Sequence, residues 1–244
     1  MIRMILDVLY IFCFFVKSIF LIPSQKRISS KDPAQGIRSS YRIVTKVLRR
    51  IASLSGVRLT VYGLENIPKD RPALFVSNHR SYFDIVTMYP LLPNPSAFIA
   101  KNNLEKIPFL AGWMRLMRCP FLDRENTADG LRIVKDSIQL IREGISVCVF
   151  PEGTRSPGDE MLPFKEGTFM IAQKAGCPVI PVAITDTEKI FENHIPFVRP
   201  GKVTISFGEP IDMAALDRNQ RRQVPALVKE TVADMITQAR MKDS

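Results

Sequence analysis

Residues 73–84 read ALFVSNHRSYFD, and residues 145–156 read ISVCVFPEGTRS. Each stretch opens with a short apolar run that is typical of a buried strand and ends in polar residues. Because α/β folds place their sites at the carboxyl ends of neighbouring strands, we expect the two polar segments to meet at one edge of a sheet. The sequence therefore predicts a site shared by two segments about seventy residues apart.

Short β-like runs alternate with helical patterns from residue 57 onward. Further strands are predicted at 58–63, 96–100, 179–184 and 203–208, and helices at 84–92, 104–117, 128–142, 166–174 and 219–241. The alternation predicts an α/β fold whose mainly parallel sheet is flanked by helices. Pro181 is expected to leave a gap or bulge in the ladder of its strand. The chain of 244 residues is long enough for one such domain, which we place at residues 55–244.

The N-terminal segment, residues 1–54, is predicted to form membrane-associated helices. Residues 4–22 are apolar except for Asp7, Lys17 and Ser18. A helix of this length would span about 28 Å, close to the hydrocarbon thickness of a bilayer. The following residues lack a small-x-small cleavage site, so a signal peptide is disfavoured and an anchor that spans or half-inserts is expected.

Residues 36–54 predict a basic amphipathic helix. Its apolar stripe consists of Ile37, Tyr41, Val44, Leu48 and Ile51, and its cations are Arg38, Arg42, Lys46, Arg49 and Arg50. Such a helix lies either in a membrane interface or on the surface of a domain. The adjacent anchor favours the membrane.

The net charge of +10 is concentrated at one end of the chain. Residues 1–60 carry eleven Lys and Arg side chains against two acids. Because this basic stretch adjoins an apolar one, membrane phospholipids rather than nucleic acid are the expected partner. The four cysteines have no CxxC spacing, so neither a disulfide framework nor a zinc site is expected.

His79 and Asp84 are the candidates for proton transfer. On a continuous helix, residues i and i+5 lie about 140° apart, so the two side chains meet only if the chain turns between them. Asp84 would then fix the imidazole tautomer, and His79 would act as a general base on a substrate hydroxyl. Asn78 would orient the loop or donate to an oxyanion. Alternatively, Asp84 is a helix cap, which is compatible with the same role.

The second segment offers a carboxylate and a cation on a turn that contains Gly153, where the backbone can approach a ligand closely. Arg155 could bind a phosphate, Glu152 an acceptor hydroxyl, and Lys165 is a second phosphate candidate near a predicted helix start. The alternative is a surface turn with a solvated Glu–Arg pair. The sequence contains no G-x-S-x-G, Walker-A or dinucleotide-binding pattern, and His194 has no partner at metal spacing.

The order of these motifs resembles the glycerolipid acyltransferases, specifically the bacterial 1-acyl-sn-glycerol-3-phosphate acyltransferases, over about residues 55–210. Four blocks carry the resemblance: Asn78 through Asp84 (His-x4-Asp), Lys101 through Pro108-Phe109 to Phe121–Arg124, Phe150–Ser156 continuing into Leu162–Lys165, and Val179–Val182. The sequence departs from the family at Arg118, which stands where the second block commonly has Gly.

The resemblance implies an enzyme that moves a fatty acyl group from acyl-CoA or acyl carrier protein to the sn-2 hydroxyl of lysophosphatidic acid, giving phosphatidic acid. It implies His79 as the base, Asp84 as its partner, Pro181 in the acyl-donor site, and neither metal nor cofactor. The residues expected to bind the acceptor are Asn78, Arg124, Glu152, Gly153, Thr154, Arg155 and Lys165. The cations that follow residues 4–22, namely Lys26, Arg27, Lys31 and Arg38, would keep the acyltransferase domain on the cytoplasmic side of the inner membrane.

Three alternatives stay open on the sequence alone. The same chemistry would act on another acceptor, such as lyso-ornithine lipid, another lysophospholipid or glycerol 3-phosphate. A non-catalytic membrane protein would bind lipid with the same residues. A hydrolase would use water in place of the acceptor.

Overall fold

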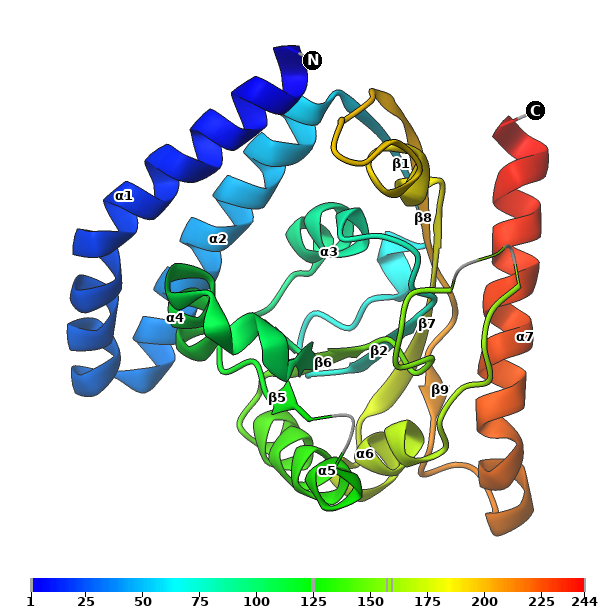
Figure 1. Ribbon diagram of the computed structural model, residues 1–244. Helices are drawn as coiled ribbons and strands as arrows, with labels where there is room; N and C mark the ends of the chain where they lie inside the picture. Colours follow the sequence, from blue (N-terminus) through cyan, green and yellow to red (C-terminus); the bar gives the residue numbers. More distant parts are fainter. Residues whose placement is uncertain (1, 124–125, 157, 159, 244) are drawn as a thin grey trace.

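A seven-stranded sheet forms the centre of the computed structural model, which describes residues 2–123, 126–156, 158 and 160–243. The strands follow the order β1-β8-β7-β2-β6-β3, and β9 pairs with β7 (Figure 1). Their bounds are β1 (Val57–Tyr62), β2 (Leu74–Ser77), β3 (Ser96–Phe98), β6 (Ser146–Val149), β7 (Pro178–Thr185), β8 (Gly201–Phe207) and β9 (Ile211–Asp212). The short strands β4 (Ala100–Lys101) and β5 (Phe121–Leu122) form a separate pair.

The sheet is mainly parallel, as the sequence predicts. β2 pairs in parallel with both β6 and β7, and β3 pairs in parallel with β6. β1 and β8 are parallel to each other, but β8 runs antiparallel to β7. The three neighbouring strands β7, β2 and β6 are buried along their whole lengths, which matches their continuous apolar sequences and brings their carboxyl ends to one edge.

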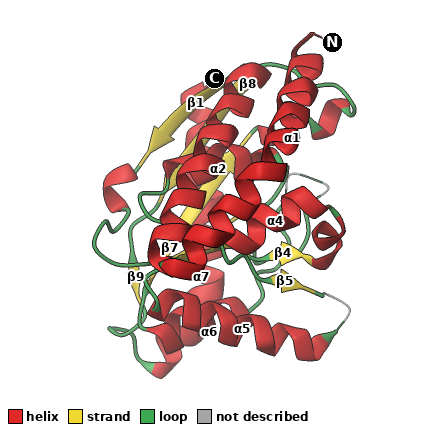
Figure 2. Ribbon diagram, turned by 90° about the vertical axis from the view of Figure 1, so that its left-hand side faces the viewer, coloured by secondary structure: helices red, strands yellow, loops and turns green. Residues whose placement is uncertain are grey.

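Helices cover both faces of this sheet. They are α1 (Ile2–Lys31), α2 (Pro33–Ser55), α3 (Phe83–Met88), α4 (Pro108–Leu116), α5 (Thr127–Arg142), α6 (Gly167–Ala175) and α7 (Arg218–Asp243). Short 3₁₀ turns lie between them: η1 (Leu64–Asn66), η2 (Tyr89–Leu91), η3 (Asn102–Lys106), η4 (Thr187–Lys189) and η5 (Glu192–His194). Figures 1 and 2 show α7 on one face of the sheet, and α3 with the α1–α2 pair on the other.

Pro181 lies at the predicted gap in the ladder of β7. On one side of β7, β8 pairs with Val182 to Thr185, and β9 pairs with Pro178 and Val179. Pro181 falls between these two partners, where its carbonyl accepts a hydrogen bond from Gly208 at 2.8 Å. A proline is therefore tolerated inside this central strand, because the donor that it lacks is not needed there.

The apolar stripe of α2 packs into the protein, so the prediction that this helix lies with its apolar face in a membrane is wrong. Ile37 and Tyr41 belong to the buried core, and Val44, Leu48 and Ile51 pack against it. The same amphipathic pattern serves either environment, and here α3 and the turn η2 pack against the helix. The alternative, a helix packed on the domain, is the one observed.

Arg118, at the position where the resemblance expects Gly, adopts a backbone conformation that favours glycine. Its φ is 60°, in the left-handed region that follows the end of α4. A non-glycine residue there costs about 1–2 kcal/mol. The side chain of Arg118 pairs with Glu143 at the surface, which offsets only part of this cost.

Substitution of Tyr41 measures how much the packing of α2 contributes to the stability of the domain. Its hydroxyl donates a hydrogen bond of 2.5 Å to the carbonyl of Leu92. Tyr41→Phe should therefore lower the free energy of unfolding by about 1 kcal/mol at neutral pH, measured by denaturant unfolding.

The same variant should remove a dependence of stability on pH. Burial raises the pKa of Tyr41 from 10.0 to about 12. Between these values the folded state keeps a proton that the unfolded state loses, so stability present below pH 10 is lost as the pH rises. The advantage of the wild-type protein over Tyr41→Phe should close by about pH 11, and a constant difference would contradict the burial of this hydroxyl.

Candidate functional site

The polar segments that follow β2, β6 and β7 meet at one edge of the sheet. The amide of His79, after β2, donates to Glu152 Oε1, after β6, at 2.8 Å. The amide of Ser156 donates to the carbonyl of His79 at 2.9 Å. The two segments that open the sequence analysis are therefore in direct contact, as predicted.

His79 and Asp84 also meet as predicted, because the chain turns before α3 begins. The imidazole Nδ1 lies 2.7 Å from Asp84 Oδ2. The same oxygen accepts hydrogen bonds from the amides of Arg80 at 2.8 Å and Ser81 at 2.9 Å. Asp84 thus orients the imidazole and holds the loop with one carboxylate oxygen, but it does not cap the helix, because it lies in the first turn of α3 and its amide partners precede that helix.

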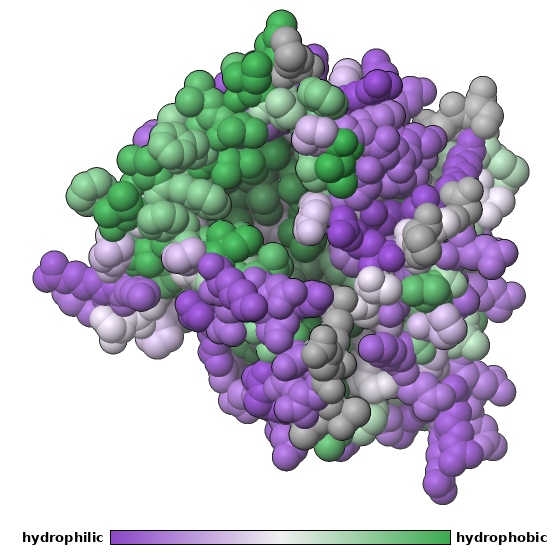
Figure 3. Space-filling view, in the orientation of Figure 1, coloured by the Kyte–Doolittle hydropathy of each residue, from purple (hydrophilic) through white to green (hydrophobic). Residues whose placement is uncertain are grey.

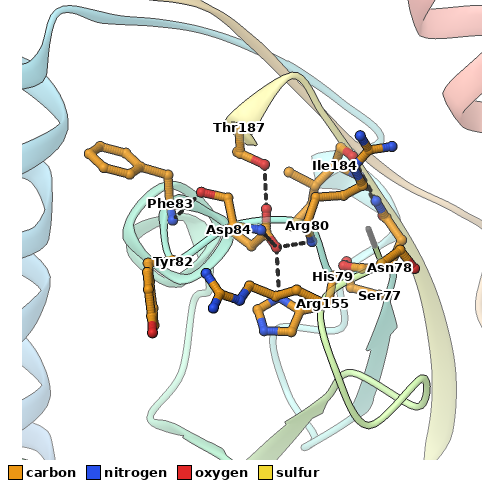
Figure 4. A network of polar contacts seen from close by, with 12 residues as sticks. Ser77, Asn78, His79, Arg80, Tyr82, Phe83, Asp84, Arg155, Ile184 and Thr187 are labelled. Carbon is orange, nitrogen blue, oxygen red and sulfur yellow. Dashed lines mark hydrogen bonds and ion pairs between the residues drawn. The ribbon is translucent and has the colours of Figure 1, made fainter. Parts of the chain in front are cut away.

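The other oxygen of Asp84 is occupied by a residue that the sequence analysis did not identify. The hydroxyl of Thr187, at the start of η4, donates to Asp84 Oδ1 (Figure 4). Both side chains are fully buried. Thr187 lies 103 residues from Asp84 and only β7 brings it there, so no local motif could have indicated it. Beside it, burial raises the pKa of Glu188, which pairs with Arg80 at 3.5 Å.

The imidazole of His79 is held by Asp84 at its Nδ1 edge and by Phe150 against its face. The ring stacks on Phe150 with centroids 4.0 Å apart and an interplanar angle of 16°. With Nδ1 committed to Asp84, the ring presents Nε2, which has no hydrogen-bond partner among the described residues. The side chain is 15% exposed, so this nitrogen is available to a ligand at a defined position.

The side chain of Glu152 connects separate loops through hydrogen bonds. Its carboxylate is buried and accepts hydrogen bonds from the His79 amide, the Leu162 amide at 2.8 Å and the Ser156 hydroxyl. Asn78 plays a similar part toward β7, because its side chain exchanges two hydrogen bonds with the backbone of Ile184, at 2.8 and 2.9 Å. Acceptor binding by these two residues stays a prediction, and it would compete with these bonds.

Gly153 and Lys165 lie together on the turn after β6. Gly153 has φ of 75°, and a Cβ placed there would lie 2.9 Å from Lys165 Nζ. The missing side chain therefore leaves room for the ammonium group directly over the turn. Lys165 and the neighbouring Thr154 are exposed, which leaves both accessible to a ligand.

Arg155 points toward the loop that carries His79. Its guanidinium carbon lies 4.3 Å from the ring centroid of Tyr82, and its Nη1 lies 3.0 Å from Glu192 Oε1. Glu192 belongs to η5, and like Thr187 it gave no signal in the sequence. Arg124 lies outside the described residues, and Pro181 is buried inside the sheet, so their predicted binding roles remain predictions.

Comparison with known proteins gives a consistent result across sequence and structure. The model of the acyltransferase family matches residues 58–185. The 1-acyl-sn-glycerol-3-phosphate acyltransferase alpha of Mus musculus is 32% identical over 202 residues, which cover 81% of this chain and 69% of that protein. The 1-acyl-sn-glycerol-3-phosphate acyltransferase of Borreliella burgdorferi is 27% identical over 195 residues, which cover 80% and 78%.

A solved structure shares the whole fold. The crystal structure of PlsC, the 1-acyl-sn-glycerophosphate acyltransferase of Thermotoga maritima, superposes with a TM-score of 0.81 at 30% sequence identity. The match covers 98% of this chain and 96% of that one, so it includes the N-terminal helices.

The contacts of Glu152 predict a cost in stability. Glu152→Gln should lower the free energy of unfolding by about 2–3 kcal/mol, because the amide group faces donors that the carboxylate satisfies. Glu160→Gln, at an exposed position, is the control and should leave stability unchanged. Equal stability of the two variants in denaturant unfolding would mean that the carboxylate of Glu152 serves a ligand rather than the fold.

Proposed function

Because this chain belongs to the acyltransferase family, we propose that it transfers a fatty acyl group to the sn-2 hydroxyl of lysophosphatidic acid and forms phosphatidic acid. The observation that carries the proposal is the His79–Asp84 pair, whose free Nε2 lies at the meeting point of three strand ends. The names of the matched relatives support this acceptor. Acyl-CoA or acyl carrier protein is the proposed donor.

The reaction needs only the groups of this chain and the two substrates. His79 Nε2 takes the proton from the acceptor hydroxyl, and the oxygen attacks the carbonyl carbon of the thioester. The ester C–O bond forms, the C–S bond breaks, and the thiol leaves with the proton that the imidazolium returns. Asp84 stabilises the imidazolium between these steps, and Thr187 fixes Asp84 by holding its second oxygen.

The acceptor phosphate is assigned to cations on the segment after β6. Arg155 and Lys165 both follow Gly153 in the chain, and the absence of a side chain at Gly153 lets the ammonium group of Lys165 lie over the turn that leads to Arg155. A guanidinium and an ammonium group together suit a phosphate dianion, the first by paired hydrogen bonds and the second as a point charge. Arg124 is a further proposed phosphate ligand.

The experiment that tests this function is acylation of lysophosphatidic acid in mixed micelles by the purified full chain. His79→Ala should lower kcat by about 10²- to 10⁴-fold, because the hydroxyl is no longer deprotonated by a general base. His194→Ala is the matched control, since the chain has only two histidines, and it should retain activity.

Three results would contradict the proposal. Unchanged turnover in His79→Ala would remove the assigned base. Release of free fatty acid without phosphatidic acid would identify a hydrolase, and preference for an acceptor without phosphate, such as monoacylglycerol, would remove the role assigned to Arg155 and Lys165.

We further propose that α1 holds the enzyme at the inner membrane, with the catalytic domain facing the cytoplasm. α1 is long and apolar enough to cross a bilayer, and three of its polar residues, Asp7, Ser18 and Gln25, are buried in the protein. Asp7 and Ser18 are buried against α2 and α4, where they bond to Ser55 and Trp113 at 2.9 and 2.8 Å. The large apolar side chains exposed on α1 are Ile2, Ile5, Leu6, Val8, Leu9, Phe12, Val16, Ile19 and Phe20, and the cations Arg3 and Lys17 are exposed among them. Figure 3 shows hydrophobic residues gathered over this side of the molecule.

The packing of α1 against α2 favours insertion into one leaflet. The helices touch at both ends of their pairing, through Ser55 with Asp7 and through Ser40 with Gln25 at 3.4 Å. A position of α1 across the bilayer would carry the five cations of α2 into the hydrocarbon, which is costly for each of them. A position along the surface buries the apolar face of α1 and leaves these cations near phospholipid head groups.

Charges on the exposed face of α1 should release the protein from membranes. Leu9→Glu with Phe20→Glu is expected to abolish flotation with vesicles that contain anionic phospholipid, since a carboxylate in hydrocarbon costs about 2.5–3.5 kcal/mol on insertion scales. The control carries the same charges at two exposed apolar positions of α7, Leu227→Glu with Met241→Glu. Equal flotation of both double variants would show that another surface binds the membrane.

A further inference from the structure

Arg155 has partners on two sides that fix its guanidinium before any acceptor arrives. Glu192 Oε1 lies 3.0 Å from Arg155 Nη1, along one edge of the guanidinium. The ring of Tyr82 lies against its face, with the guanidinium carbon 4.3 Å from the centroid (Figure 4). An edge contact and a face contact together define both the direction and the plane of the group.

Glu192 is itself anchored to the loop that carries the imidazole. The same Oε1 accepts a hydrogen bond from the amide of Tyr82 at 2.8 Å. Its side chain is 14% exposed, and Oε2 is buried without a hydrogen-bond partner among the described residues. One carboxylate oxygen thus links Arg155, on the segment after β6, to the loop between His79 and Asp84. The distance between the proposed phosphate arm and the proposed base is set through this oxygen.

The pairing leaves Arg155 able to bind an anion. A guanidinium has five N–H groups, and the structure assigns one nitrogen, Nη1, to Glu192. The remaining donors suffice for paired hydrogen bonds to a phosphate. An arginine that is already held loses less side-chain freedom when it binds an anion.

We infer that Glu192 and Tyr82 are positioning residues that hold Arg155 for the phosphate of the acceptor. This inference rests on the proposed function and extends it to the connection between β7 and β8, which carries Glu192. The segment between β7 and β8 then contributes to the selection of phosphate-bearing acceptors. It does so indirectly, because Glu192 contacts Arg155 and the backbone of Tyr82. Binding of the acceptor should depend on this contact more than the chemical step does.

The test compares lysophosphatidic acid with monoacylglycerol, which lacks the phosphate, in Glu192→Gln and Glu192→Ala. The glutamine keeps an oxygen for the Tyr82 amide and removes the charge beside Arg155, so it guards against simple misfolding. We expect KM for lysophosphatidic acid to rise about 10-fold in Glu192→Gln and more in Glu192→Ala, with kcat within about threefold of wild type. Turnover of monoacylglycerol should not change. Glu143→Gln, which removes a carboxylate paired with Arg118 at the surface, is the control and should behave as wild type.

A double-mutant cycle assigns the effect to Arg155. If Glu192 acts through Arg155, then Glu192→Gln should add less than twofold to the KM of Arg155→Ala. Additive effects, an unchanged KM, or an equal loss with monoacylglycerol would overturn the inference. Loss of phosphate selectivity in Arg155→Ala without any loss in the Glu192 variants would overturn this inference alone. No loss in Arg155→Ala would overturn the proposed phosphate site together with it.

Discussion

The buried carboxylate of Asp84 is the contact on which the site depends. Its two oxygens receive the imidazole Nδ1 of His79, two backbone amides and the hydroxyl of Thr187. A buried charge is tolerated only when such donors surround it. These donors come from the loop after β2 and from the turn after β7, so the carboxylate is satisfied only when the two strands are paired. The site is therefore complete only when β7 is paired with β2 in the sheet.

The interactions that the sequence could predict are those encoded by local pattern. Buried strands appear as short apolar runs, and the spacing of His79 and Asp84 already requires a turn between them. Thr187 and Glu192 could not be predicted, because each reaches the site through the pairing of β7 with β2 and belongs to no local motif. The orientation of α2 was also beyond local pattern, because its amphipathic stripe suits a protein core and a membrane surface equally.

The roles of polar residues in the candidate site separate once their partners are known. The hydrogen bonds of Glu152 join two loops to each other. Those of Asn78 join its loop to β7. His79, Lys165 and Arg155 still have nitrogen atoms that can form hydrogen bonds with a ligand. From the sequence these residues form one list of polar candidates. The geometry divides them into a group that builds the edge of the sheet and a group that is available to a ligand.

The contact between α1 and α4 contains a natural fluorescent probe. Trp113 is the only tryptophan of the chain, and its indole N–H donates to the Ser18 hydroxyl at 2.8 Å while its ring stacks on Phe14, with centroids 5.4 Å apart. Separation of α1 from α4 would expose this ring and change both its emission maximum and its quenching. Intrinsic fluorescence therefore follows the attachment of the apolar helix in the unmodified protein, independently of any enzymatic assay.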